Sequence, residues 1–287
     1  MYLNTLGKNE MYQSVAEMLG TDIETIKQYV MDNSENIIDC NYDENSIETM
    51  DLEPLLKRSN CIRPKKIDSL TVSHITPRED VDSVWQEGLL TLPHTLTKRT
   101  TLSEYLRELG FEFLFNGKQI TMKRYGKEVD IDRLQFSNLK MRLGGDKTLN
   151  DFNVNGYLFV NEFEIDAVRG WLGSPEFLKS LAVAYSKNSI ADKYADYCRN
   201  YYVSFEVPLE MADIEGFSEW IDEDTKTLIL LRYTINALAY LEMKRKPFLP
   251  MYNPIILLKR NYDVPSHNIR KIWSFRYEGN KLVPVER

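Results

Sequence analysis

The fold of this chain is organised around the stretch Leu70-Thr-Val-Ser-His-Ile-Thr-Pro-Arg-Glu-Asp-Val-Asp-Ser-Val-Trp-Gln-Glu-Gly-Leu-Leu90. Its first part predicts a short strand over residues 69–75, because side chains of a strand point alternately to its two faces. Thr76-Pro-Arg-Glu79 predicts a helix start, with a hydroxyl cap, proline at the first position and glutamate three residues after the cap. This strand-to-helix unit would deliver His74, flanked by two hydroxyl side chains, to the junction.

The helix that follows is expected to bury one stripe of side chains and to end at a glycine. Val81, Val84 and Trp85 have the spacing of a buried helical face. Gly88 is the expected C-terminal stop, because glycine adopts the left-handed conformation with little steric cost.

Composition indicates a soluble globular protein with one acidic segment. Hydrophobic residues make up 43% and charged residues 28% of the 287 residues, and the net charge is −7. Residues 1–60 carry a net charge of −8, whereas residues 61–287 carry +1. The overall sign argues against nucleic-acid binding through the whole surface. No run of about 18 apolar residues and no signal peptide is visible, so we expect a cytoplasmic protein without a membrane partner.

The N-terminal segment predicts a helical hairpin followed by a polar linker. One face carries Met11, Val15, Met18 and Leu19, and Gly20 separates it from a second amphipathic stretch that starts at a capping box over residues 21–24. We therefore expect two domains: residues 1–60, an acidic helical hairpin and linker, and residues 61–287, an α+β domain.

The remainder of the chain alternates strand and helix patterns with short connections. A hairpin is expected to turn at Asn116-Gly117, and Gly126 indicates a second turn. Further strands are expected at residues 157–160, 201–207, 254–258 and 271–277, and a long helix at residues 222–244. The predicted fold class is α+β, with a largely antiparallel split sheet flanked by helices and preceded by the N-terminal hairpin.

Cysteine and histidine spacing does not favour a metal centre. The three cysteines, Cys40, Cys61 and Cys198, are too irregularly spaced for paired zinc ligands, and no His-Glu-x-x-His spacing occurs. His94 and His267 fall in predicted loops, where solvated side chains are the expected interpretation. No metal ion is therefore predicted.

The order of these parts resembles the ADP-ribosyltransferase-like fold, especially the small bacterial DarT-like toxins. The resemblance rests on a first strand ending in His74-x-Thr76, a helix that ends in Gly88-Leu-Leu90, the aromatic stretch Tyr157-Leu-Phe159, and the late element Val264-Pro265 with Ile269 and Ile272. It covers residues 68–277 in outline. It implies a transferase that uses NAD⁺ as substrate, with a role as a bacterial toxin or phage-defence effector.

The resemblance also implies roles for individual residues. His74 would hydrogen-bond the ribose, Thr76 or Ser73 would contact the adenosine side, and Tyr157 would stack on nicotinamide. Imidazole and hydroxyl groups suit ribose diols, and an aromatic face suits a planar cationic ring. Cleavage of the glycosidic bond further needs a carboxylate that stabilises an oxocarbenium-like transition state.

The expected position of that carboxylate holds Asn253, which can hydrogen-bond a ribose hydroxyl but carries no charge. Glu206 or Glu242 would have to replace it, or the fold has no transferase activity. Each has a simpler interpretation, since Glu206 can be the outward residue of a half-buried strand and Glu242 can lie on the wet side of its helix.

Two alternatives without catalysis follow. In the first, the protein is an interaction or regulatory protein whose N-terminal helical pair binds a protein partner on a catalytically incomplete scaffold. In the second, it binds nucleic acid through C-terminal basic residues, namely Lys244-Arg-Lys246, Lys259-Arg260 and Arg270-Lys271. Such charge runs are more often solvated surfaces.

Overall fold

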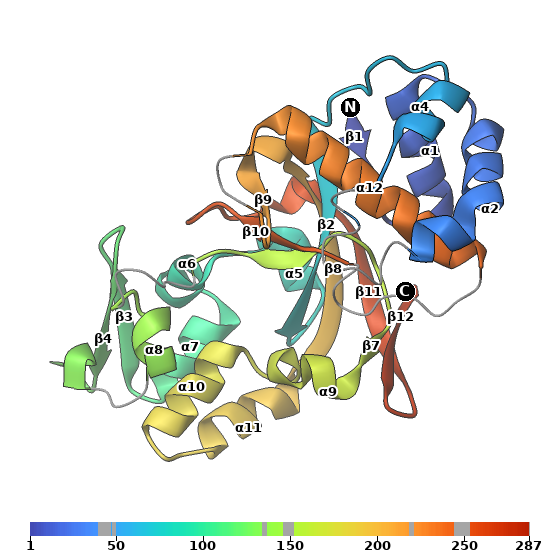
Figure 1. Cartoon of the computed structure of the whole chain (residues 1–287). Helices are drawn as coiled ribbons and strands as arrows, with labels where there is room; N and C mark the ends of the chain where they lie inside the picture. Colours follow the sequence, from blue (N-terminus) through green and yellow to red (C-terminus); the bar gives the residue numbers. More distant parts are fainter. Residues whose placement is uncertain are drawn as a thin grey trace. The chain divides into compact units, whose positions relative to one another are not determined.

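A computed structural model describes residues 1–39, 47, 50–133, 137–145, 152–217, 221–243 and 253–286. It shows an α+β fold in which antiparallel strands are flanked by helices, with a helical pair at the N-terminus (Figure 1). The predicted fold class is confirmed. Within the described residues, no helix is long and apolar enough to cross a membrane.

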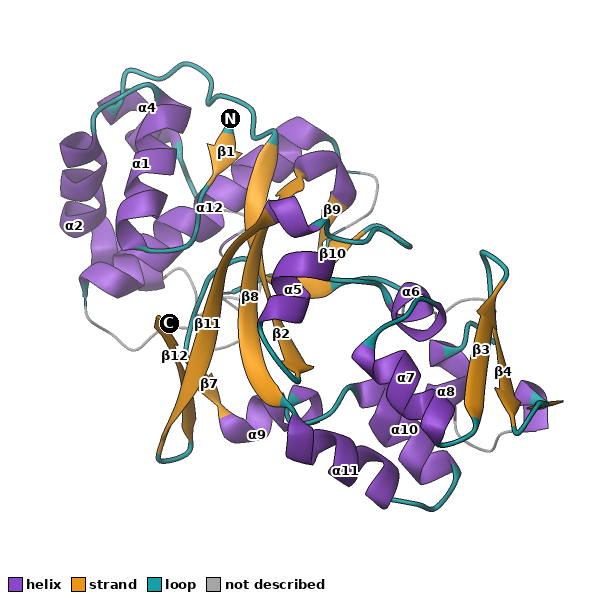
Figure 2. Cartoon of the chain, turned by 180° about the vertical axis from the view of Figure 1, so that it is seen from behind, coloured by secondary structure: helices purple, strands orange, loops and turns teal. Residues whose placement is uncertain are grey.

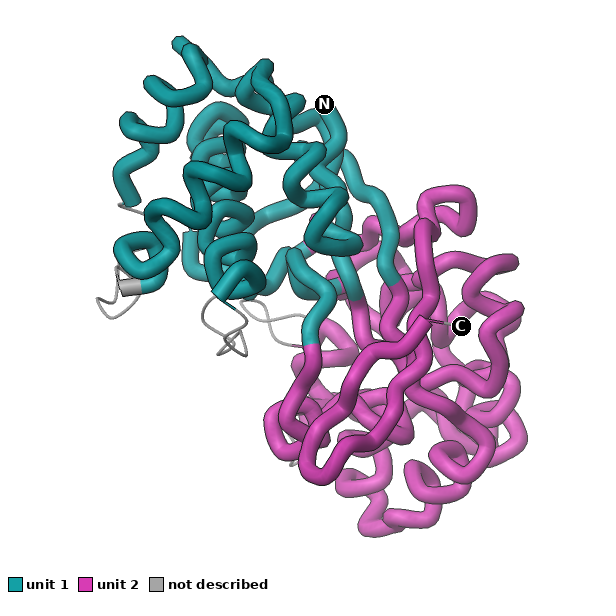
Figure 3. Tube along the Cα trace, turned by 90° about the vertical axis from the view of Figure 1, so that its right-hand side faces the viewer, with its two compact units in different colours: residues 1–73, 155–161, 204–257 teal, residues 74–154, 162–203, 258–287 magenta. Residues whose placement is uncertain are grey.

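The chain forms two compact units, and each unit is assembled from separate stretches (Figure 3). Unit 1 comprises Met1–Ser73, Asn155–Asn161 and Ser204–Leu257. Unit 2 comprises His74–Val154, Glu162–Val203 and Leu258–Arg287. Residues 1–60 thus group with later parts of the chain. The boundary at residue 60 stays a prediction about independent folding.

The helices of unit 1 include the predicted N-terminal pair. Helix α1 (Lys8–Leu19) ends at Gly20, whose φ of 68° is left-handed, and α2 (Ile23–Asp39) follows. Both helices pack against α12 (Glu223–Glu242), and α4 (Glu53–Arg58) contacts α2. Burial confirms the predicted inward face of α1, which carries Met11, Val15, Met18 and Leu19. Helix α2 likewise buries Ile26, Tyr29 and Val30.

The N-terminus of α2 is capped one residue later than the predicted capping box. Asp22 Oδ1 accepts a hydrogen bond from Thr25 N at 2.8 Å, so Asp22 rather than Thr21 is the capping side chain. Helix α12 is capped in the same way, with Asp222 Oδ1 2.7 Å from Thr225 N. The predicted cations at its end, Lys244-Arg-Lys246, lie outside the described residues.

The sheet residues of unit 1 come from six strands. In the order β8, β2, β6, β10 and β9, neighbouring strands are hydrogen-bonded, and the short β1 pairs in parallel with the start of β2. The bounds are β1 Tyr2–Leu3, β2 Ser69–Arg78, β6 Asn155–Tyr157, β8 Arg199–Pro208, β9 Ala212–Ile214 and β10 Ile255–Leu258. Strands β2 and β8 each have residues in both units.

Unit 2 holds the predicted hairpin and most of the short helices. Strands β3 and β4 pair around Asn116-Gly117, and β5 returns after Gly126, which confirms both predicted turns. Helices α6 and α7 lie beside β3 in both ribbon views, and α10 lies beside α8 (Figures 1 and 2). The helix bounds are α5 Asp82–Glu87, α6 Leu92–Thr97, α7 Thr101–Glu108, α8 Ser137–Arg142, α9 Ile165–Val168, α10 Glu176–Ala184 and α11 Ser189–Tyr197.

The strands of unit 2 include one that the sequence pattern did not reveal. The bounds are β3 Phe111–Phe115, β4 Ile120–Arg124, β5 Lys127–Glu128, β7 Phe163–Glu164, β11 Ile269–Glu278 and β12 Lys281–Glu286. The prediction stopped at residue 277 and missed β12, which pairs with β11 and β7. Its sequence, Lys-Leu-Val-Pro-Val-Glu, contains a proline, which argues against a strand unless tertiary pairing favours one.

The helix start predicted at Thr76 is wrong. Strand β2 continues through Thr76 and Pro77 to Arg78, and α5 begins only at Asp82. Ile75, Thr76 and Pro77 are all buried, and burial holds this segment in the strand. Val81 is the N-cap residue, and the preceding Asp80 accepts a hydrogen bond from Ser83 N through Oδ1 at 2.7 Å. Val84 is buried as predicted, whereas Trp85 is 46% exposed and does not belong to the buried stripe.

Candidate functional site

Seven side chains share one face of the unit 1 sheet, which we call the hydroxyl face. Ser73 Oγ lies 2.8 Å from Ser204 Oγ on the neighbouring strand, and Ser69 Oγ donates to Glu206 Oε1 at 2.6 Å. Tyr157 stands directly opposite Ser73 in the register of β2 and β6. The complete set is Tyr2, Ser69, Thr71, Ser73, Tyr157, Ser204 and Glu206.

Strand periodicity explains why these polar groups meet. Side chains two residues apart point to the same face, so Ser69, Thr71 and Ser73 line up along β2 while Ser204 and Glu206 line up along β8. The intervening residues Leu70, Val72, Phe205 and Val207 are fully buried and form the apolar face. One sheet therefore carries a hydrophobic side and a polar side within the same few residues.

The centre of the hydroxyl face is closed and its edges are accessible. Ser73, Thr71 and Ser204 are all 0% exposed, and Thr71 Oγ1 lies 2.6 Å from Tyr2 Oη. Glu206 and Tyr157 are only half-buried. Burial and the nearby charge of Glu215 raise the pKa of Tyr157 to about 12, so its phenol keeps its proton at neutral pH. Ligand access is thus better at Glu206 and Tyr157 than at Ser73.

Asn253 has a buried position just before β10. Its Oδ1 accepts from Phe159 N at 2.9 Å, while its Nδ2 donates to Phe159 O at 2.9 Å and to Asn161 Oδ1 at 2.7 Å. The side chain is 1% exposed. These three bonds hold the segment immediately after Tyr157, so Asn253 positions that segment.

Glu242, the other predicted carboxylate, is bound to the N-terminal helix instead of the sheet. Its Oε1 accepts from Tyr12 Oη at 2.7 Å and pairs with Lys8 Nζ at 2.9 Å. Burial opposes ionisation of this carboxyl group, but the hydrogen bonds from Lys8 and Tyr12 outweigh it and lower the pKa of Glu242. The ionised side chain therefore joins α12 to α1.

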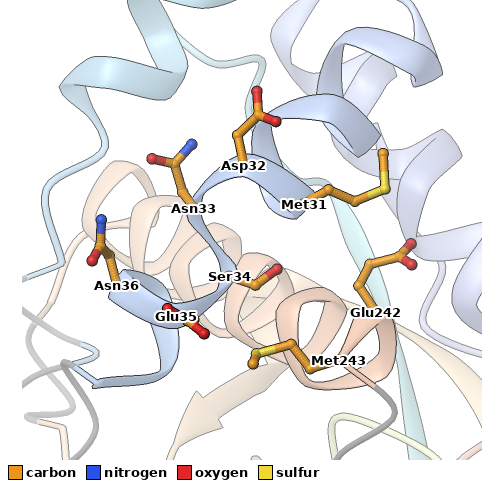
Figure 4. Close-up of a pocket in the computed structure, with 8 residues that line it drawn as sticks. All are labelled: Met31, Asp32, Asn33, Ser34, Glu35, Asn36, Glu242 and Met243. Carbon is orange, nitrogen blue, oxygen red and sulfur yellow. The ribbon is translucent and has the colours of Figure 1, made fainter.

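A cavity of about 460 Å³ lies beside Glu242 in unit 1 (Figure 4). In the close-up, Asn33 and Asn36 point away from α12, whereas the hydroxyl of Ser34 lies on the side of α2 that faces α12. Ser34 Oγ donates to Val30 O at 2.5 Å. The lining is polar and acidic with two methionines: Met31, Asp32, Asn33, Ser34, Glu35, Asn36, Glu242 and Met243.

The predicted site residues are therefore distributed unevenly. Ser73, Tyr157 and Glu206 share the hydroxyl face, whereas Asn253 and Glu242 have separate structural partners. His74 and Thr76 lie in the part of β2 that belongs to unit 2, where His74 is half-buried and Thr76 is buried. The sequence interpretation did not identify Ser204 and Ser69. Ser204 could have been found, because it lies two residues before Glu206 on the same strand and therefore shares its face.

No metal site accompanies these residues. The described part of the chain contains no group of three or more His, Cys, Asp or Glu side chains that could hold a metal ion. Cys61 and Cys198 are free thiols, and Cys40 lies outside the described residues. Comparisons with protein-family models, with curated proteins and with solved structures found no match.

Proposed function

We propose that the protein binds NAD⁺ at the accessible edges of the hydroxyl face and acts as an ADP-ribosyltransferase, with Glu206 as its carboxylate. The observation that carries this proposal is the position of Glu206, which shares one sheet face with Ser73 and Tyr157. Glu242 is the weaker candidate because Tyr12 and Lys8 occupy its carboxylate.

Cleavage of the bond between nicotinamide and ribose requires a fixed negative charge beside the ribose. Glu206 is half-buried and Ser69 orients it, which suits a carboxylate that stabilises positive charge on the ribose carbon as the nicotinamide bond breaks. Tyr157 offers an aromatic face and a protonated hydroxyl at neutral pH. His74 and Thr76 stand at alternate positions of β2 from Ser73, so we do not assign them to this site. A cytoplasmic location with access to NAD⁺ belongs to the same proposal.

Incubation of the full chain with labelled NAD⁺ tests the proposal. Nicotinamide release would be followed by chromatography, and label transfer would be followed on added protein and nucleic acid. We expect Glu206→Gln to lower release by about 100-fold or more, the scale of losing one transition-state electrostatic partner. The matched variant Glu242→Gln should change release by less than about threefold.

Three outcomes separate the possibilities. Absence of binding, release and transfer in the wild-type chain would refute the proposal. Binding without turnover would support an NAD⁺-binding protein that lacks transferase activity. Equal activity of the wild type and Glu206→Gln would remove Glu206 from the mechanism, and label on an acceptor would open the toxin or phage-defence role to direct tests.

A second function, partner binding through the N-terminal helical pair, is favoured by the cavity beside α2. Met31 lines that cavity and is 51% exposed, which is unusual for a large apolar side chain. Deleting residues 1–60 would not test this cleanly, because β1 pairs with β2 and the helical pair packs on α12.

Point variants are the sharper test of partner binding. Met31→Lys should abolish capture of a specific partner. Tyr277→Lys, at an exposed aromatic residue in unit 2, should not affect it. Capture that is equal for both variants would exclude this surface.

A further inference from the structure

A second arrangement with catalytic geometry lies in unit 2, formed by residues from segments far apart in the sequence. His94, in α6, places its Nδ1 2.7 Å from Oδ2 of Asp263, which directly precedes Val264. The backbone bridge between Leu89 and Val264 brings the two segments together. We call these two residues the His94–Asp263 pair.

Asp263 is held as a carboxylate by its neighbours. Its Oδ1 accepts from Thr91 N at 2.9 Å and from Thr91 Oγ1 at 3.0 Å, and Lys98 Nζ lies 3.0 Å from Oδ2. Burial opposes its ionisation, but the hydrogen bonds from Thr91, His94 and Lys98 outweigh burial and lower the pKa of Asp263. The group that faces His94 Nδ1 is therefore a hydrogen-bond acceptor with a negative charge.

This geometry determines which imidazole nitrogen carries hydrogen. Because the carboxylate accepts, Nδ1 of neutral His94 is the protonated nitrogen and Nε2 keeps its lone pair. The side chain of His94 is 30% exposed, and Nε2 has no hydrogen-bond partner among the described residues. An imidazole oriented by a carboxylate, with a basic outward nitrogen, is the arrangement of a general base.

The surroundings of the pair favour an anionic ligand. The His94 ring lies edge-on to half-buried Phe115 at 6.2 Å, and Phe115 packs on Phe152 at 5.7 Å. The guanidinium of exposed Arg260 stacks over Phe152 at 4.9 Å and donates to Lys118 O at 2.8 Å. Lys98 remains 53% exposed. The cations Lys98 and Arg260 suit the phosphates of single-stranded nucleic acid, and half-buried Phe115 packs against the core of unit 2.

We propose that the His94–Asp263 pair is a second reaction centre that cleaves single-stranded RNA, with His94 Nε2 as general base. RNA carries a 2′-hydroxyl group next to each phosphate, and this hydroxyl is a group that a general base can deprotonate. In the step, Nε2 takes the proton of the ribose 2′-hydroxyl, the 2′-oxygen attacks the adjacent phosphorus, and the bond from phosphorus to the 5′-oxygen breaks. The leaving 5′-oxygen takes a proton from water, and the resulting hydroxide takes the proton from Nε2, which regenerates water and the base. The products are a 2′,3′-cyclic phosphate and a 5′-hydroxyl.

This centre is independent of the NAD⁺ proposal, because neither residue belongs to the hydroxyl face. Asp263 is a positioning residue that orients the base, whereas His94 would touch the reacting hydroxyl. Lys98 and Arg260 would attract the phosphates, which predicts binding that weakens with salt.

The test incubates the full chain with a short, end-labelled, mixed-sequence single-stranded RNA and resolves the products by gel and mass spectrometry. We expect cyclic-phosphate products from the wild type and a loss of about 100-fold or more in His94→Gln, the scale of general-base catalysis. His267→Gln is the matched control, since His267 is also a histidine of unit 2 and is exposed. RNA carrying 2′-O-methyl groups should stay intact.

Three results would overturn the proposal: intact RNA with the wild type, unchanged cleavage by His94→Gln, or equal cleavage of the 2′-O-methyl RNA. A measurement on the wild type guards against a variant that fails to fold. Nitrogen-15 NMR of the imidazole groups should show hydrogen on Nδ1 of His94, and hydrogen on Nε2 of the neutral ring would also refute the proposal.

Discussion

The hydroxyl face and the His94–Asp263 pair use the same chemical groups in opposite ways. In the hydroxyl face, Ser73 and Ser204 bond to each other in a fully buried position, and Glu206 bonds to Ser69. In the pair, one carboxylate takes the hydroxyl, amide and ammonium of its neighbours and leaves an imidazole nitrogen outward. The buried contact between Ser73 and Ser204 therefore stabilises the sheet, whereas half-buried Glu206 and the outward nitrogen of His94 are accessible to a ligand.

The hydroxyl face and the His94–Asp263 pair also differ in how far they follow from local sequence patterns. The hydroxyl face follows from a period of two along strands that are recognisable one by one. The His94–Asp263 pair joins residues 169 positions apart, and the backbone bridge between Leu89 and Val264 lies next to it in both segments. Four substitutions follow, from the largest expected effect to the smallest. The first two examine this comparison directly, and the other two extend it to polar groups elsewhere in the chain.

Gly88→Ala should have the largest effect, because it acts on the backbone that assembles the pair. Gly88 has φ +75°, and an added Cβ would lie 2.0 Å from Val264 O. Backbone strain and this clash should lower the free energy of unfolding by about 3 kcal/mol or more. Urea denaturation measures it. The control is Gly117→Ala, at φ +88° with open space around it, which should cost only about 1 kcal/mol. An equal cost for Gly88→Ala and Gly117→Ala would refute the close approach of Gly88 to Val264.

Ser73→Ala tests whether the hydroxyl face is a stabilising element. It removes the partner of Ser204 inside a closed region, so we expect a loss of about 1–3 kcal/mol in the free energy of unfolding. The double variant Ser73→Ala/Ser204→Ala should lose less than the two single losses combined, with a coupling of about 1 kcal/mol. Strict additivity in urea denaturation would show that the two hydroxyl groups do not interact.

Glu242→Gln tests whether the carboxylate of Glu242 stabilises the fold. The folded state lowers the pKa of Glu242, so its ionisation stabilises the protein above the unfolded-state pKa, and this contribution disappears as pH falls. At pH 7 we expect a loss of about 1.5 kcal/mol, the scale of charge-assisted hydrogen bonds.

The difference between wild type and Glu242→Gln should shrink as the pH falls below the ordinary glutamate pKa, and it should vanish once the pH has passed the lowered pKa of Glu242 and the wild-type side chain is also neutral. Thermal unfolding across pH gives the measurement. Glu210→Gln, at an exposed residue of the same unit, should stay within about 0.5 kcal/mol at every pH.

Asp22→Ala has the smallest expected effect and tests the cap at the N-terminus of α2. Loss of the bond to Thr25 N should lower the thermal unfolding midpoint slightly, because one backbone donor of the first turn loses its cap. Thr21→Ala should be close to neutral, although the sequence pattern favoured Thr21 as the cap. If Thr21→Ala destabilised the protein more than Asp22→Ala, Thr21 would be the capping residue, as the sequence pattern predicted.

Much of the fold was predictable because it depends on short-range patterns. The N-terminal helical pair, the hairpin around Asn116-Gly117 and the strand that carries Glu206 all follow from periodicity and turn chemistry. The failures share one cause: burial and strand pairing in the folded chain override the local sequence pattern. Residues 75–78 have the composition of a helix start but are buried in β2, and β12 contains a proline yet pairs with two strands.

For the candidate site, the sequence by itself determined the residue types and the faces on which they stand. The outward position of Glu206 and the strand position of His74 are local properties of the backbone. Tertiary structure decided which groups meet: Glu242 bonds to Tyr12 and Lys8, Asn253 holds Phe159 and Asn161, and Asp263 orients His94. The physical reason is that hydrogen bonds reach only about 3 Å, so partners distant in sequence are fixed by packing alone.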